Sequence, residues 1–219
     1  MSKENSYFDQ GKNVIYLNDL SSEVLFHELT HLLSFNFLKF QVPNEYYIFI
    51  NNFFTNSNNT SLITKFLDLC KKRKKEIIQS FSTEIGKEYI TNANNERDKI
   101  NKDSLNMELH LISLIEDIVD SIYNGESATR GLTYINNDDT NSFKVKKTNG
   151  HGCEYYTTNN YQFEEILANY QAIMLIDPNN ELFVLLKNIL GQDFISFLDQ
   201  RCNEMCGKFF KPELSSKKM

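Results

Sequence analysis

The order of apolar and polar positions along the chain predicts a protein built mainly from helices. Apolar residues recur at the spacing that places them on one face of a helix. The segments with this spacing are 22–39, 44–54, 60–80, 104–123, 161–174, 180–190 and 193–206. Apolar residues cover most of the surface of 104–123, so we expect that helix to face the core.

Shorter stretches favour strands and loops. A β-rich run at 13–17 follows a polar lead-in at 1–12, which we expect to be loose. The helical period disappears at 126–160, and short β pieces are expected there at 132–135 and 143–146. Long irregular segments of this kind are often functional.

These elements predict a mainly α fold of the α+β class, with residues 1–219 in a single domain. The 8 Gly and 3 Pro residues are too few for the many tight turns of a β-sandwich. Four cysteines are too few for a disulfide scaffold at a length of 219 residues.

One helix carries residues suited to metal chemistry. Phe26-His27-Glu28-Leu29-Thr30-His31 places two histidines four positions apart, on one helix face. Their imidazoles can converge on one zinc ion, and Glu28 can act as general base on a nearby water. Ser21 or Ser22 can cap this helix. The motif predicts a site for one Zn2+ ion held by His27 and His31.

A catalytic zinc site needs a third protein ligand. We expect Glu165, because it shares a helix face with Ala168 and Asn169. The small Ala168 would let this helix approach the histidine helix closely. Asn169 would hydrogen-bond the outer nitrogen of a ligating histidine, supporting it from behind. Glu164 competes with Glu165 for the ligand role.

Other polar groups could supply ligands, but ordinary structural roles are the simpler interpretation of each. Glu116, Asp117 and Asp120 are rival sources of the third ligand, and two of them share a face. Cys202 and Cys206 form a second spaced pair, for which two small core residues are the simpler interpretation.

Two further features are interpreted structurally. His110 lies between apolar neighbours on the core-facing helix and is expected to be a structural histidine. The basic run 71–75 is expected to be a solvated helix face.

The net charge and the N-terminal sequence argue against nucleic acid and membranes as binding partners. The net charge of -6 argues against a general nucleic-acid surface. The polar segment 1–13 lacks the apolar core of a signal peptide, and no apolar run is long enough to span a membrane. We expect a cytoplasmic protein that binds neither nucleic acid nor membrane, unless a route without a signal peptide exports it.

The two halves of the predicted site resemble the gluzincin metallopeptidases. In that family one helix carries the HExxH motif, here His27 to His31, and a second carries a glutamate, here in Glu165-Ile166-Leu167-Ala168-Asn169. The segment 161–168 is similar to the glutamate helix of anthrax lethal factor and of the bacterial Pro-Pro endopeptidases. The stretch 150–156 looks like that of small zincin-like modules in phage and mobile-element proteins.

The resemblance covers 13–35 and 150–175 and implies a reduced zincin-like core with a small sheet edge. Residues 41–125 would then form a large helical insertion between the HExxH helix and the helix that carries Glu165. The separation between these halves is far longer than is usual for gluzincins.

The resemblance also implies a mechanism. Zinc held by His27, His31 and Glu165 would acidify a water, and Glu28 would take its proton and pass it to the leaving amine. A side chain from the loop before the glutamate helix would stabilise the oxyanion. The candidates are His151, Tyr155, Tyr156 and Tyr161, of which we favour His151 and Tyr156.

The sequence therefore predicts a zinc-dependent peptidase acting on a peptide or protein substrate. The alternative is a zinc-binding partner or regulatory module of a bacterial or phage mobile element that cleaves nothing. The short N-terminal part motivates this alternative, because little sheet edge remains to hold an extended substrate. The oligomeric state is left open by the sequence.

Overall fold

Helices dominate the computed structural model, which describes residues 6–18, 21–39, 41–80, 104–123, 132–137, 142–147 and 161–210. The helices are α1 (Ser22–Leu33), the π-helix η1 (Ser34–Leu38), α2 (Asn44–Thr55), α3 (Ser57–Ser80), α5 (Ser104–Ile122), α7 (Tyr161–Ile176), α8 (Glu181–Leu190) and α9 (Gln192–Phe210). The strands are β1 (Tyr7–Asp9), β2 (Val14–Tyr16), β3 (Leu132–Asn137) and β4 (Ser142–Lys147). They form two antiparallel hairpins, β1–β2 and β3–β4. The expectation of a mainly α fold of the α+β class is confirmed.

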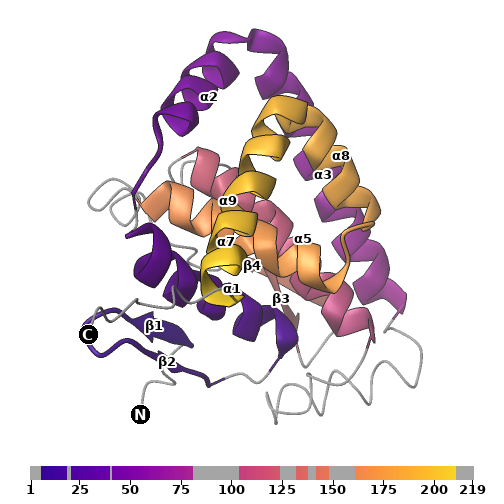
Figure 1. The fold of residues 1–219 in the computed structure, drawn as a ribbon. Coiled ribbons are helices and arrows are strands. Elements are labelled where there is room, and N and C mark those ends of the chain that lie inside the picture. The colour runs from indigo at the N-terminus through magenta and orange to yellow at the C-terminus, as the bar shows by residue number, and fades with distance from the viewer. Residues whose placement is uncertain are drawn as a thin grey trace, which may run out of the picture.

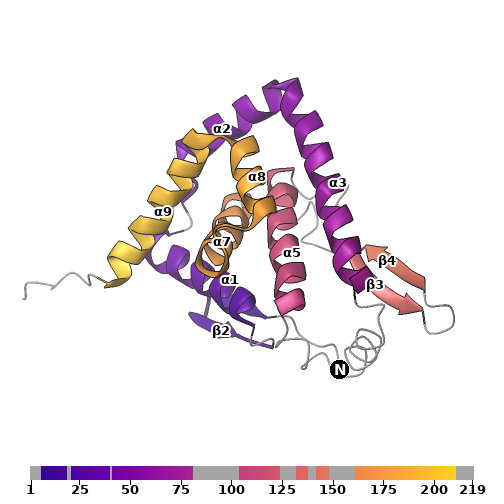
Figure 2. The same ribbon diagram turned by 90° about the vertical axis from the view of Figure 1, so that its right-hand side faces the viewer.

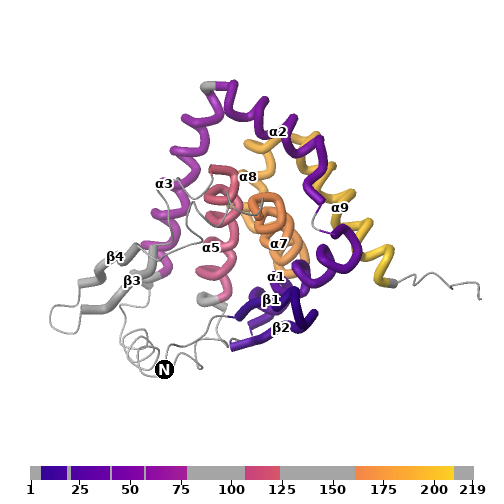
Figure 3. The backbone as a smooth tube through the Cα atoms, turned by 90° about the vertical axis from the view of Figure 1, so that its left-hand side faces the viewer, coloured from indigo at the N-terminus to yellow at the C-terminus, as the bar shows by residue number. Residues whose placement is uncertain are grey.

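Helix α7 lies at the centre of the molecule, with α1 and α5 packed against it (Figures 1 and 2). Its residues from Phe163 to Tyr170 are all buried, as expected for a helix that is apolar around most of its circumference. Figures 2 and 3 show α9 and α3 on opposite sides of this centre, with α2 bridging them at one end. The hairpin β1–β2 lies against α1 at the other end.

The described part of the N-terminal lead-in, residues 6–12, contains a strand, contrary to the sequence expectation of a loose segment. Residues 7–9 form β1 and pair with β2 in the register Tyr7–Tyr16, Phe8–Ile15 and Asp9–Val14. The Tyr7 and Tyr16 rings stack with centroids 4.9 Å apart. A strand of three residues carries too few alternating positions for a clear pattern, and β1 forms by pairing with β2 and packing against α1.

Helix boundaries differ from the expected ones at several points. The helix expected over 22–39 is an α-helix only to Leu33 and continues as η1, and Lys39 ends it in the left-handed conformation at φ 56°. Helix α3 begins at Ser57 rather than at 60, and α9 extends to Phe210. The hydroxyl of Ser21 caps α1 by accepting from the Val24 N–H at 3.4 Å.

The basic run 71–75 is not a uniformly solvated face. Lys72, Arg73 and Lys75 are exposed, whereas Lys74 is 3% exposed and forms an ion pair with the buried Glu116 of α5. The pair joins α3 to α5. Within the described ranges, no helix combines the length and apolarity needed to cross a membrane.

Candidate metal centre

The packing of α1 against α7 brings the two halves of the predicted site together. The buried Ala168 on α7 leaves room for α1, and three side chains converge at this contact. His27 and His31 lie one helical turn apart on α1, and Glu165 reaches them from α7. Their side chains are 15%, 12% and 3% exposed, so the site is largely shielded from solvent.

The separations of the donor atoms match a tetrahedral zinc site. The two histidine Nε2 atoms are 3.1 Å apart. His27 Nε2 lies 3.4 Å from Glu165 Oε2, and His31 Nε2 lies 3.5 Å from Oε1. Zinc bonds of about 2.0–2.1 Å in tetrahedral geometry would hold neighbouring donors about 3.3–3.4 Å apart. The three residues therefore fit one zinc ion.

The hydrogen bond on the far side of His27 fixes which nitrogen can bind a metal. Asn169, which is 0% exposed, accepts at Oδ1 from His27 Nδ1 over 2.9 Å. An amide oxygen only accepts, so Nδ1 carries the proton and a neutral His27 presents the Nε2 lone pair to the site. This is the contact that the position of Asn169 predicts, one turn after Glu165.

The two histidine Nε2 atoms lie within hydrogen-bond distance of each other, whereas their contacts with Glu165 are longer. The 3.4 and 3.5 Å separations between the histidines and Glu165 are longer than ordinary N–H to oxygen hydrogen bonds. With its Nδ1 proton committed to Asn169, a neutral His27 has none for Glu165. Two imidazole nitrogens and a buried carboxylate, gathered within 4.8 Å of one another, are donor types that zinc takes in proteins.

Glu28 lies beside this cluster on α1 and is 8% exposed. Burial raises the pKa of its carboxyl, and the charge of Glu165 raises it further, whereas His27 and the Phe8 backbone N–H lower it. A carboxyl with a raised pKa is a better proton acceptor when ionised, which suits a general base.

A cavity of about 270 Å3 opens over these residues. Its walls come from α1, from the N-terminal end of α7 and from the hairpin segment 6–10. Tyr161, one turn before Glu165, lines the cavity, and its oxygen accepts from Gln10 Nε2 at 3.5 Å. The β1–β2 hairpin is thereby joined to α7 across the cavity.

The competing carboxylate, Glu164, lines the same cavity but is not one of the donors that lie together. It is 2% exposed, and burial raises its pKa to about 7, while the nearby Ser34 hydroxyl and the Arg201 charge lower it. Among the described residues, His27, His31 and Glu165 form the group whose donor atoms lie together, and Glu164 is not part of it. The geometry favours Glu165 as the third ligand.

The other candidates lie apart from the cluster. Glu116 pairs with Lys74, and His110 Nδ1 lies 3.7 Å from a Glu23 carboxylate oxygen. Cys202 is a buried free thiol. His151 and Tyr156, the residues favoured for oxyanion stabilisation, lie outside the described residues.

The sequence does not predict that Phe8 and Gln10 line the cavity. Both belong to the lead-in that lacks a clear strand pattern, and no motif marks them. Tyr161, by contrast, is among the oxyanion candidates that the sequence predicts, and it lies four positions before Glu165 on the same helix face.

A comparison of the chain with protein-family models, with curated proteins and with solved structures finds no match.

Proposed function

We propose that this protein is a zinc-dependent metallopeptidase that hydrolyses peptide bonds. The observation that carries the proposal is the His27–His31–Glu165 cluster, whose donor separations suit zinc, with the buried Glu28 in the same cavity. The HExxH motif alone is short. The stronger argument is that a glutamate from a distant helix, Glu165, completes the set of ligands begun by His27 and His31.

When bound, zinc supplies Lewis acidity, which polarises a peptide carbonyl and acidifies water. His27, His31 and Glu165 would hold the ion, and Asn169 would keep His27 in the tautomer that presents Nε2. Glu28 takes the proton of the attacking water and transfers it to the leaving amine.

Tyr161 is the described residue best suited to the oxyanion role. Its phenol lines the cavity that also contains Glu28 and the histidines. A phenol donates a hydrogen bond to negative oxygen, and such donors stabilise the charge that develops in the transition state. This assignment supplements the sequence preference for His151 and Tyr156.

Zinc content and cleavage of a peptide library by the purified protein and by Glu28→Gln test the proposal. We expect one zinc per chain in both, with the rate in Glu28→Gln lowered about 100- to 10,000-fold, since only the proton transfer is removed. A protein that binds no zinc, or a Glu28→Gln variant that cleaves at the original rate, contradicts it.

A pair of adjacent substitutions tests the ligand assignment. Glu165→Gln should abolish stoichiometric zinc binding, because a neutral amide replaces the charged ligand. Glu164→Gln is the matched control and should retain zinc. If both variants lost zinc equally, the loss would come from disruption of α7 rather than from removal of a zinc ligand.

A second candidate function is a zinc-binding module that recruits a partner without cleaving it. The small cavity favours this alternative, because a volume of about 270 Å3 restricts access to the proposed base. Bound zinc without turnover of any library peptide would support the module and exclude the peptidase.

A further inference from the structure

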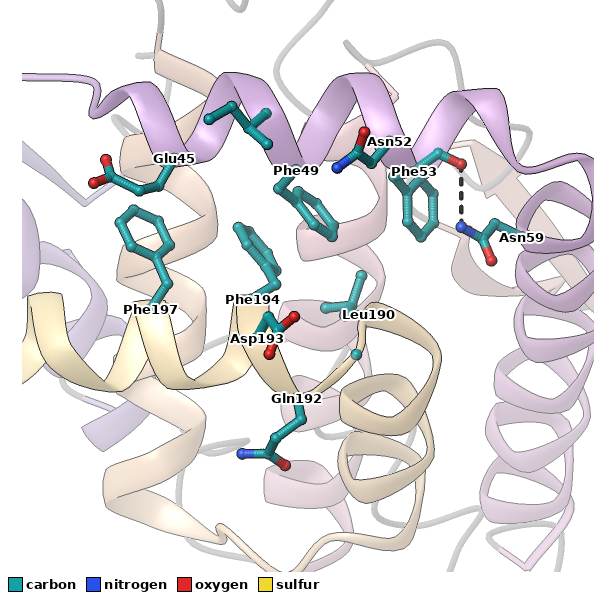
Figure 4. Close-up of a pocket in the computed structure, with 12 residues that line it drawn as sticks. Glu45, Phe49, Asn52, Phe53, Asn59, Leu190, Gln192, Asp193, Phe194 and Phe197 are labelled. Atoms are coloured by element: carbon teal, nitrogen blue, oxygen red, sulfur yellow. Dashed lines mark hydrogen bonds between the residues drawn. The ribbon is translucent and has the colours of Figure 1, made fainter.

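A second hollow lies between α2 and the start of α9, at the end of the molecule away from the β1–β2 hairpin (Figure 2). It has a volume of about 550 Å3, within the range of about 300–1,000 Å3 typical of ligand pockets. Figure 4 shows side chains from α2 facing those of α9 across it. None of its lining residues belongs to the proposed zinc site.

The floor of this groove is aromatic. The rings of Phe49 and Phe194 stack with centroids 3.5 Å apart and nearly parallel planes. Phe53 and Phe197 extend the apolar surface to either side (Figure 4). Ile48 stands on the wall with 60% of its surface exposed. Tyr47 and Phe54 of α2 are also exposed, at 45% and 44%, so this end of the molecule carries several exposed apolar side chains, a feature common at interaction sites.

The charges at the groove have one sign. Glu45 and Asp193 line it and are both exposed, and among the described residues that line it none is Lys, Arg or His. Figure 4 shows Glu45 beside Phe197 and Asp193 below Phe194, so acid flanks the apolar floor at two places. Complementarity therefore favours an occupant with apolar side chains at its centre and cations at its sides.

The same acidic side chains argue against two other occupants of the groove, a second copy of the chain and an anionic membrane. In a two-fold dimer each copy would present the same acidic rim to its partner, and a net charge of -6 adds to the repulsion. An anionic membrane surface would be repelled for the same reason.

We propose that this groove docks a protein segment that carries a large apolar side chain flanked by Lys or Arg. The apolar side chain lies on the Phe49–Phe194 floor against Ile48, and the flanking cations pair with Glu45 and Asp193. The interaction does not depend on the zinc site.

The proposed preference for an apolar centre flanked by cations can be tested by the binding of three short labelled peptides. One has a Phe-Leu centre flanked by Lys, a second has the same centre flanked by Glu, and a third keeps the Lys residues but replaces the centre by Ser. Binding to the full chain is followed by fluorescence anisotropy at about 150 mM salt, which screens charges beyond about 8 Å. We expect the Lys-flanked apolar peptide to bind at least tenfold more tightly than the other two.

Substitutions inside and outside the groove show where the peptide binds. Ile48→Ser should weaken the Lys-flanked peptide at least fivefold, whereas Leu175→Ser, at a site 53% exposed and outside the groove, should leave it unchanged. Asp193→Lys should shift the preference toward the Glu-flanked peptide. All three substitutions are at exposed positions, so thermal melting should show folded proteins.

Three results would overturn the proposal. The first is equal binding of the Lys- and Glu-flanked peptides. The second is a loss of affinity in Leu175→Ser as large as in Ile48→Ser. The third is a dimer of the unaltered protein that Ile48→Ser dissociates, which would assign the groove to a second copy of the chain.

Discussion

Replacing Asn169 with Leu tests whether the hydrogen bond behind His27 supports a metal ligand. The substitution keeps a side chain of similar size at a position that is 0% exposed and removes the acceptor 2.9 Å from Nδ1. Loss of such a partner typically weakens metal binding about 10- to 100-fold, or about 1.4–2.7 kcal/mol. Asn169→Asp keeps an acceptor and adds a negative charge, so it should bind zinc at least as tightly as the unaltered protein.

The free energy of unfolding of the metal-free protein should change little in Asn169→Leu, in contrast to its zinc affinity. Asn169 Nδ2 is buried and has no hydrogen-bond partner among the described residues, so its removal relieves the desolvation cost of an unpaired donor. The same substitution leaves His27 Nδ1 without its acceptor, which adds a desolvation cost of similar size. We expect these effects to cancel within about 1 kcal/mol in urea unfolding.

Zinc affinity is measured by competition with a chromophoric chelator. Gln171→Leu, which removes an amide from the same helix outside the cluster, is the control and should keep the original affinity. The reasoning is refuted if Asn169→Leu is folded and binds zinc as tightly as this control.

Further substitutions test the proposed oxyanion donor, the buried ion pair and the α8–α9 turn. Tyr161→Phe should lower kcat about 100- to 1,000-fold in peptide cleavage while zinc content stays unchanged, because one transition-state donor is lost. Lys74→Met should destabilise the fold by about 3–5 kcal/mol in urea unfolding, and adding Glu116→Leu should restore most of this loss. Burial raises the pKa of Glu116, so its carboxyl binds a proton more readily when folded; the Lys74→Met defect should therefore shrink as the pH falls. Gly191→Ala should lower Tm by about 2–8 °C, because φ is 89° there although a Cβ would meet no atom, whereas Gly207→Ala within α9 should not lower it.

The sequence was sufficient to predict the relative positions of side chains on one helix. The spacing of His27 and His31, and of Glu165 and Asn169, gives the face each pair shares, and the contacts follow once α1 meets α7. That these two helices meet was inferred from the small Ala168 and from the family resemblance. Helical periodicity likewise predicted most of the helices.

Features that depend on distant partners were not predictable. Lys74 looks like any other member of its basic run, and only the position of α5 gives it a buried carboxylate. The lead-in strand is stabilised by contacts with β2 and α1 rather than by its own pattern. The expected roles of His151 and Tyr156 fall outside the described residues and stay predictions.

The distance along the chain between the two halves of the metal centre bears on how the protein folds. His27 and Asn169 are 142 positions apart, so neither half can form the donor set until most of the chain has been synthesised and α7 has docked on α1. Closing so long a loop is entropically unfavourable in the unfolded chain, and an ion bound at its junction favours the closed state. Zinc acquisition would therefore be a late step in folding. The α1–α7 contact should be the first part of the fold to open when the ion is withdrawn, and hydrogen exchange would detect this as lost protection in these two helices.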